Sequence, residues 1–293
     1  MCQSSDGWEH VEPAPPLHPG GTLAYHSRLM KRMQLFEFED FPWFPHFLRQ
    51  YLTNYLVSFH RFIGTADLLR PLLERALRDT GTTTIVDLCS GGGGPMPGTC
   101  RAMLTDGRLT SLTLTDKYPN LDAARSINRE NGPIRYREQS VDAGDVPAEL
   151  TGLRTMVGSF HHMPEPVARR ILEGAFIARR PFCLYELSDN SAPKALWWAA
   201  LPVNVLVVLF AMPFVRPVSL GQLFWTYVFP VLPPLIAWDG TTSNARTYTP
   251  DDLRELTKDL VAPDYTWEIG LTRKKGYPGN ASYLLGLPRA ASR

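Results

Sequence analysis

Three aspartates in the first half of the chain stand at the ends of predicted strands and have the chemistry to hold a polar ligand. Asp87 ends the run TTIVD, Asp116 ends LTSLTLTD, and Asp142 follows IRYREQSV. Runs of this kind indicate buried strands. The first is followed by LCSGGGG and then by Pro95 and Pro97, so the backbone turns without side chains in its way before a helix begins. We interpret this glycine loop as a cradle for a nucleotide cofactor.

Two histidines and one glutamate further along the chain could contact a substrate. His161 and His162 lie in the segment GSFHHMPEP, directly after a predicted strand, and Glu186 ends the run FCLYE. Either histidine could be a general base, although a loop histidine held by the backbone is an equal alternative. Glu186 would face a site at the carboxyl end of its strand. The four cysteines have no metal-ligand spacing, so we expect no metal site.

The pattern of the chain predicts an α/β fold that holds these residues at strand ends. Strands and helices alternate along most of it, as they do in βαβ units. We expect strands at 83–87, 109–115, 134–141, 153–158 and 182–187, and helices at 66–78, 121–131, 166–178 and 250–260. Two last strands, at 265–273 and 281–287, have so short a connection that they must pair antiparallel. The predicted fold is a Rossmann-like doubly wound sheet, mostly parallel, with a C-terminal antiparallel strand pair.

A nicotinamide-dependent dehydrogenase is the first alternative, because it also has a strand, a glycine loop and a later acid. However, Cys89 occupies the first glycine position of its GxGxxG motif, and a terminal antiparallel pair is unusual for a dinucleotide fold. An acid at Asp87 would also lie badly beside a pyrophosphate, whereas it suits a ligand with an ammonium group. The sequence therefore disfavours a dehydrogenase.

In these features the chain resembles the class I S-adenosylmethionine-dependent methyltransferases, over about 83–189 and 249–287. VDLCSGGGG is similar to the first motif of that family, and GSFHHMPEP is similar to its fourth motif, which borders both cofactor and substrate. The resemblance implies S-adenosylmethionine as the cofactor. It also implies cofactor contacts from Asp87, Cys89, Gly91, Gly93, Asp116, Asp142, Ala143 and Ser159.

The resemblance gives each acid a role. Asp87 and the glycine loop would surround the methionine end of the cofactor. Asp116 would accept hydrogen bonds from both ribose hydroxyls, since a carboxylate has two acceptor oxygens. Asp142 would lie near the adenine amino group, with backbone contacts from Ala143. No base is assigned in this way, so His161, His162 and Glu186 all stay candidates for a catalytic role.

A long apolar segment interrupts the pattern, because Arg216 is the one charged residue in 195–238. The runs 195–215 and 217–238 are each about long enough to cross a hydrocarbon core of roughly 30 Å. Their prolines argue against simple membrane-spanning helices. We consider three alternatives for this apolar helical hairpin: insertion into a membrane, a lid over an apolar substrate pocket, and a dimer interface.

The same features suggest how the chain is divided. We expect a disordered tail at 1–21, an aromatic helical cap at 22–64, a methyltransferase domain at 65–190 and 249–293, and a hydrophobic insertion at 191–248. The net charge is +1, from 30 basic and 29 acidic residues, which argues against a nucleic-acid partner.

The sequence therefore predicts a methyltransferase that acts on a hydrophobic small molecule or lipid. We expect contact with a membrane through 195–238 and a catalytic domain that faces the cytosol. If this segment forms a lid instead, the protein is expected to be cytoplasmic. A membrane-anchored scaffold without activity is the other alternative, although a scaffold has no need of the three acids.

Overall fold

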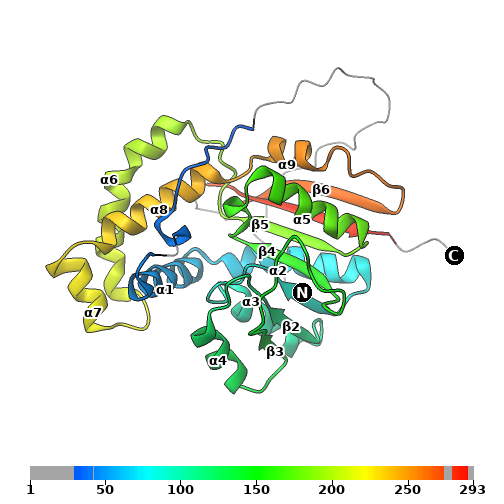
Figure 1. The fold of residues 1–293 in the computed structure, drawn as a ribbon, viewed down its shortest axis with the longest axis horizontal. Coiled ribbons are helices and arrows are strands. Elements are labelled where there is room, and N and C mark those ends of the chain that lie inside the picture. The colour runs from blue at the N-terminus through cyan, green and yellow to red at the C-terminus, as the bar shows by residue number, and fades with distance from the viewer. Residues whose placement is uncertain (1–29, 42, 274–278, 290–293) are drawn as a thin grey trace, which may run out of the picture.

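Seven strands form one mixed sheet at the centre of the protein (Figure 1). The computed structural model describes residues 30–41, 43–273 and 279–289. The strands are β1 (Thr84–Asp87), β2 (Ser111–Leu114), β3 (Ile134–Tyr136), β4 (Leu153–Val157), β5 (Phe182–Glu186), β6 (Tyr265–Thr272) and β7 (Ala281–Pro288). They lie in the order β3-β2-β1-β4-β5-β7-β6. The first five are parallel, and β7 runs antiparallel between β5 and β6, so the predicted sheet is confirmed.

Apolar side chains on both faces of the central strands explain this architecture. In β1, the neighbours Ile85 and Val86 point to opposite faces of the sheet and are 1% and 2% exposed. Ile85 lies opposite Leu112 of β2 on one side and Leu153 of β4 on the other. Because both faces of β1 are buried, helices have to cover the sheet on both sides.

Two groups of helices do so. Helices α2 (Thr65–Thr80), α3 (Met96–Thr105) and α4 (Leu121–Arg129) pack on one face, and α5 (Glu165–Ile177) and α9 (Pro250–Thr257) pack on the other. Leu73 of α2 and Leu172 of α5 have no exposed surface. Thr249 and Asp252 form a capping box that starts α9. The doubly wound α/β arrangement predicted from the sequence is therefore confirmed.

Strand β3 is shorter than the strand predicted at 134–141. It ends at Tyr136, because the next four residues, REQS, are polar and give no apolar face to bury. The chain returns to the sheet at Val141, whose N–H donates to the carbonyl of Asp116 over 2.9 Å. Asp142 therefore follows a loop, although it stays beside the end of β2.

A group of helices, here called the helical lobe, lies at one end of the sheet (left in Figure 1). Its members are α1 (His46–Ile63), α6 (Lys194–Ala211), α7 (Leu220–Leu223) and α8 (Leu232–Arg246). Further short helical turns are η1 (Phe38–Asp40), η2 (Phe160–His162), η3 (Met212–Phe214) and the π-helical η4 (Phe224–Val228).

The predicted apolar hairpin takes the form of α6 packed along α8. The second run, 217–238, is not one helix. Its two parts, Leu220–Val228 and Leu232–Arg246, are bent by 88° at a break that contains Pro230, whose ring and missing N–H interrupt a helix. The tail expected at 1–21 and the start of the cap, 22–29, lie outside the described residues.

Candidate active site

Asp87 is buried at the end of β1 and is hydrogen-bonded to the glycine loop. Its carboxylate accepts the hydroxyl of Ser90 over 2.7 Å and that of Thr155 over 2.5 Å, and only 3% of the residue is exposed. Burial raises the pKa of Asp87 to about 7, although both hydroxyls act in the opposite direction. In this conformation Asp87 fixes the loop that would face a cofactor.

The loop depends on unusual backbone conformations. Gly91 and Gly93 have φ values of 52° and 96°, in the region that favours glycine, and Cys89 reaches φ 56° without being a glycine. Gly92 approaches α1 so closely that an added Cβ would lie 2.7 Å from the methyl carbon of Thr53. Helix α1 therefore packs directly against the glycine loop.

Asp116 is hydrogen-bonded to this loop at the end of β2. One of its oxygens accepts the N–H of Gly91 and the other accepts the N–H of Tyr118, both over 2.8 Å. The hydroxyl of Tyr136 donates to the Gly91 carbonyl from β3 over 2.8 Å. Burial raises the pKa of Asp116, while the backbone N–H donors partly offset this effect. The sheet thus brings the glycine loop and Asp116 together.

Asp142 and Ala143 lie at the margin of this group. Lys117 donates to Asp142 over 2.9 Å and lowers its pKa, and the N–H of Gly144 donates to the other carboxylate oxygen over 2.8 Å. Ala143 is nearly buried, in the same apolar cluster as Cys89. Asp142 therefore has a preset orientation, and its side chain is 34% exposed.

A cavity of about 400 Å³ lies between the helical lobe and the carboxyl ends of β4 and β5. Its apolar walls come from α1 and α6 and include Leu52, Leu56, Phe59, Trp197, Val207 and Val208. Its polar end is formed by Glu39, His161, His162, Glu186 and Asp239. The structure therefore places the three candidate catalytic residues in one cavity, apart from the glycine loop but on the same edge of the sheet.

Each histidine of the pair is held by a carboxylate. Nδ1 of His161 lies 2.9 Å from Glu186, which also accepts the backbone N–H of His161 over 3.1 Å. Nδ1 of His162 lies 2.9 Å from Asp40. Burial alone would lower the pKa of His162, but Asp40 and the neighbouring carboxylates raise it to about 9. Ser159, two residues before His161, has a buried hydroxyl that makes no hydrogen bond among the described residues.

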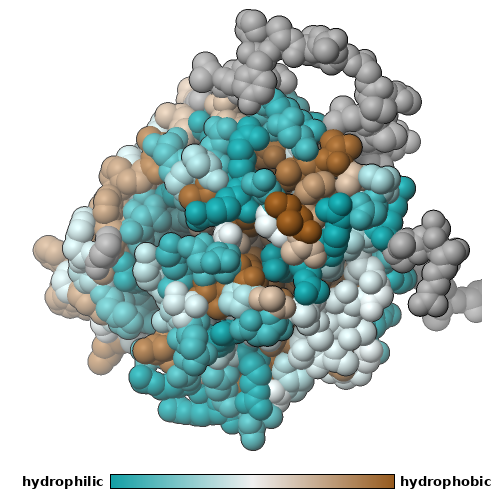
Figure 2. Space-filling view, turned by 45° about the vertical axis from the view of Figure 1, so that its right-hand side comes forward, coloured by the Kyte–Doolittle hydropathy of each residue, from teal (hydrophilic) through white to brown (hydrophobic). Residues whose placement is uncertain are grey.

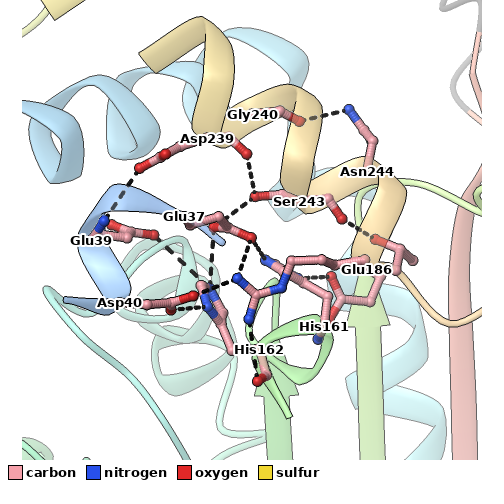
Figure 3. Close-up of polar contacts among 12 residues, drawn as sticks. Glu37, Glu39, Asp40, His161, His162, Glu186, Asp239, Gly240, Ser243 and Asn244 are labelled. Atoms are coloured by element: carbon pink, nitrogen blue, oxygen red, sulfur yellow. Dashed lines mark hydrogen bonds and ion pairs between the residues drawn. The ribbon is translucent and has the colours of Figure 1, made fainter. Parts of the chain in front are cut away.

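Sequence reasoning missed the residues that complete this group (Figure 3). Glu37 has no exposed surface and accepts the hydroxyl of Ser243 over 3.0 Å. Arg246 forms ion pairs with Glu37 and Asp40. Asp239 accepts the N–H of Phe38 over 2.9 Å, which fixes η1 against α8. The available signal was an acidic segment, FEFED, inside an aromatic run and an arginine shortly after the apolar segment.

Comparisons with known proteins found similar structures only. No model of a protein family matches the sequence, and no curated protein matches it. The plantazolicin methyltransferase BpumL in complex with SAH has a TM-score of 0.48 at 9% identity, over 83% of this chain and 98% of that chain. Magnesium protoporphyrin IX methyltransferase (ChlM) from Synechocystis PCC 6803 with bound SAH has a TM-score of 0.42 at 14% identity, over 78% and 83%.

A third similar structure is described as a putative Zn-dependent alcohol dehydrogenase from Rhodobacter sphaeroides, with a TM-score of 0.41 at 13% identity, over 74% of this chain and 89% of that chain. With TM-scores below 0.5, these likenesses carry no argument about this chain. The order of the seven strands, with β7 antiparallel between β5 and β6, shows a Rossmann-like α/β fold. Its C-terminal antiparallel pair agrees with the sequence resemblance to the class I S-adenosylmethionine-dependent methyltransferases.

Proposed function

We propose that this protein is an S-adenosylmethionine-dependent methyltransferase whose acceptor is a hydrophobic small molecule or lipid. The observation that carries the proposal is the pairing of two features on one edge of the sheet. Asp116 is hydrogen-bonded to the backbone of the glycine loop, and a cavity with apolar walls and a polar end opens beside the β4 and β5 ends. The first suits a nucleoside cofactor and the second suits an apolar acceptor.

The two acids at the loop are suited to different parts of the cofactor. Each carboxylate oxygen of Asp116 keeps a lone pair beyond its backbone contact, so the residue can accept two ribose hydroxyls. Asp142, oriented by Lys117 and the Gly144 N–H, can accept the adenine amino group, and the backbone of Ala143 adds a contact. Asp87 acts through the loop it supports.

The chemistry asked of the protein is limited, because the sulfonium activates its own methyl group. The site has to align the acceptor atom, methyl carbon and sulfur and to exclude water. A hydroxyl or amine acceptor also loses a proton. We assign this task first to His161, whose ring is oriented by Glu186 and whose Nε2 makes no hydrogen bond to any residue that the structure describes. His162 and Asp40 form a second pair of the same kind.

An apolar surface on the helical lobe supports access from a membrane. Its exposed side chains include Val203, Phe210, Phe214, Leu220 and Val228, at 58%, 77%, 76%, 88% and 71%. Contiguous exposed apolar patches often mark interaction sites. Figure 2 shows hydrophobic residues mixed with others along the left margin and a further group near the centre and upper right, while much of the face turned to the viewer is hydrophilic.

One helix among the described residues, Ala195–Phe214, is long and apolar enough to cross a membrane, and α7 with α8 passes that test only as a bent pair. One side of α6 packs along α8, where Asn204 donates to Thr241 over 3.2 Å. A helix with one packed side and one apolar exposed side suits shallow insertion better than a crossing. We therefore place the lobe in the membrane surface and the sheet in the cytosol.

Calorimetric titration tests the cofactor, with S-adenosylmethionine, its demethylated product and NADH as ligands. We expect the first two to bind and NADH to fail, and the absence of binding by the first two would end the proposal. Incubation of lipid extracts with a radiolabelled methyl donor tests the acceptor class. Cofactor binding without transfer to any extract would favour the scaffold alternative.

A further inference from the structure

Three potential ligand atoms converge where η1 meets η2 beneath α8 (Figure 3). They come from Glu37, His161 and His162 and lie within 4.8 Å of one another. Nε2 of each histidine is 3.8 Å from an oxygen of Glu37, which is too far for a hydrogen bond. Ligands bound at about 2.1 Å to one ion lie roughly 3.0–3.4 Å apart. The two distances from Glu37 to the histidines exceed that spacing by about 0.4–0.8 Å, so the side chains would have to close around the ion.

The rings are already turned in the way metal-binding histidines require. Nδ1 of His161 is 2.9 Å from Glu186, and Nδ1 of His162 is 2.9 Å from Asp40. Because a carboxylate only accepts, we assign the proton to Nδ1 in both rings, which directs both Nε2 atoms toward Glu37. A carboxylate on the distal nitrogen is the usual outer partner of a histidine that binds a metal.

Two of these atoms have unused bonding capacity. Nε2 of His161 makes no hydrogen bond in the described part of the chain, and Oε1 of Glu37 makes no hydrogen bond there but lies 3.1 Å from Nη1 of Arg246 in an ion pair. The two residues are 6% and 0% exposed. Buried polar atoms ordinarily have partners, and an unpaired one is unfavourable. A cation between them would satisfy both.

The surrounding charge also favours a cation. Five carboxylates converge here, from Glu37, Glu39, Asp40, Glu186 and Asp239. Arg246 offsets part of this charge through its ion pairs with Glu37 and Asp40. Buried carboxylates are stable when they are paired or coordinate a metal. Without an ion, the raised pKa of His162, about 9, makes that ring a second cationic group beside Arg246. A divalent ion at Nε2 would replace the His162 proton among these carboxylates.

We propose that Glu37, His161 and His162 bind a divalent transition-metal ion, with a coordination position open toward the cavity. Two imidazoles and one carboxylate suit Zn²⁺, Mn²⁺ or Fe²⁺. Oε1 of Glu39, 3.9 Å from Nε2 of His162, is placed to act as a fourth ligand. The proposed binding of the ion does not depend on the proposed methyltransferase function.

The role of the ion rests on the proposed function. An ion at the polar end of the cavity would hold an oxygen or nitrogen of the methyl acceptor, and a bound hydroxyl is more acidic than a free one. Because His161 would then be a ligand, the proton of the acceptor would pass to another group at the polar end of the cavity, such as the Asp239 carboxylate.

Metal titration of the full-length protein, after EDTA treatment and dialysis, tests the site with Zn²⁺ and Mn²⁺ as probes. We expect one ion per chain by calorimetry, and a melting temperature that rises with the ion. Glu37→Gln and His162→Gln should weaken binding more than 100-fold. The matched control is His60→Gln, which alters another buried histidine of the same cavity, bonded to Thr65, and should leave binding unchanged.

The outer partners provide a second test. Asp40→Asn and Glu186→Gln should lower metal affinity 10–100-fold without removing a ligand. Failure of the wild-type protein to bind either ion, or equal binding by the Glu37 and His162 variants, would overturn the proposal in favour of an ion-pair network with protonated His162. If the variants do not fold, the wild-type titration still decides. A parallel titration with S-adenosylmethionine shows whether the proposed function fails independently.

Discussion

Asp116 is the residue at which the cofactor assignment can be tested most sharply. Its carboxylate accepts the N–H groups of Gly91 and Tyr118 on separate oxygens, both over 2.8 Å. Each oxygen keeps a second lone pair, so the proposed cofactor adds two ribose donors to a carboxylate that is already oriented. Asp116→Ala removes both acceptors, whereas Asp116→Asn keeps one of them.

The expected loss follows from the number of hydrogen bonds. A bond to a charged acceptor contributes about 1.5 kcal/mol at the lower end of its range. Two of them amount to about 3 kcal/mol, which corresponds to a roughly 100-fold higher Kd for Asp116→Ala. Asp116→Asn should lose about tenfold. Loss of the loop contact itself adds little, because Gly91 is exposed and water can bond to its N–H.

Calorimetry with S-adenosylmethionine and with its demethylated product measures these changes. Equal losses for both ligands would point to the ribose, because only one of them carries the sulfonium charge. The control is Asp122→Ala, which removes a 65% exposed carboxylate from α4 that pairs with Arg125, and its Kd should match the wild type. A Kd within twofold of the wild type for Asp116→Ala, in a protein that melts normally, would refute the ribose assignment.

Three other changes test the conformation of the glycine loop, the protonation of Asp87 and the membrane contact of the helical lobe. Gly93→Ala should lower the free energy of unfolding by about 1–2 kcal/mol, because φ is 96° and the added Cβ would lie 3.2 Å from a ring carbon of Pro97. Gly98→Ala is the control: an added Cβ meets open space there, so this change should be neutral or stabilising. Urea denaturation measures both. The pKa of Asp87 is raised to about 7 in the folded state, so between pH 4 and 7 the folded protein holds a proton that the unfolded chain has lost. The free energy of unfolding should therefore fall as the pH rises from 4 to 7, by up to about 1.4 kcal/mol per pH unit, and Asp87→Asn should flatten this slope. Phe210→Glu should reduce co-sedimentation with anionic lipid vesicles several-fold, while Ile177→Glu, equally apolar and 68% exposed on α5, should not.

Much of the fold could be predicted because its signals are local. The β1 run TTIVD is apolar on both faces, and the connection KKGYPGN is too short for a parallel crossover, so both the buried strand and the antiparallel pair follow from a few neighbouring residues. The predicted length of β3 was wrong, because β3 lies at the edge of the sheet and the residues after Tyr136 have few apolar side chains to bury. Pro230 marks a break in the second apolar run, but a local signal of this kind does not give the 88° angle between the two helical parts.

The candidate site likewise has one part that the local sequence predicts and one part that it does not. Asp116 and the glycine loop lie on consecutive strands, and consecutive parallel strands bring their carboxyl ends to one edge of the sheet. The contacts of the histidine pair join distant segments instead: His162 meets Asp40 across 122 residues, and Arg246 meets Asp40 across 206. No local pattern contains such pairings. Glu37 therefore looked like one acid in an aromatic run, although it is the residue on which both histidines converge.

One loop connects the two halves of the proposed site and explains why the insertion follows β5. Gly158 leaves β4 with φ 62° and donates its N–H to the carbonyl of Tyr185 over 2.8 Å, and three residues later the N–H of His161 donates to Glu186. This loop is therefore held against the end of β5, beside the cavity. The apolar segment begins soon after β5 and builds the other side of that cavity with α6 and α8. An insertion at this point can change the lining of the cavity without disturbing the glycine loop, because separate hydrogen bonds from Asp87 and Asp116 hold that loop.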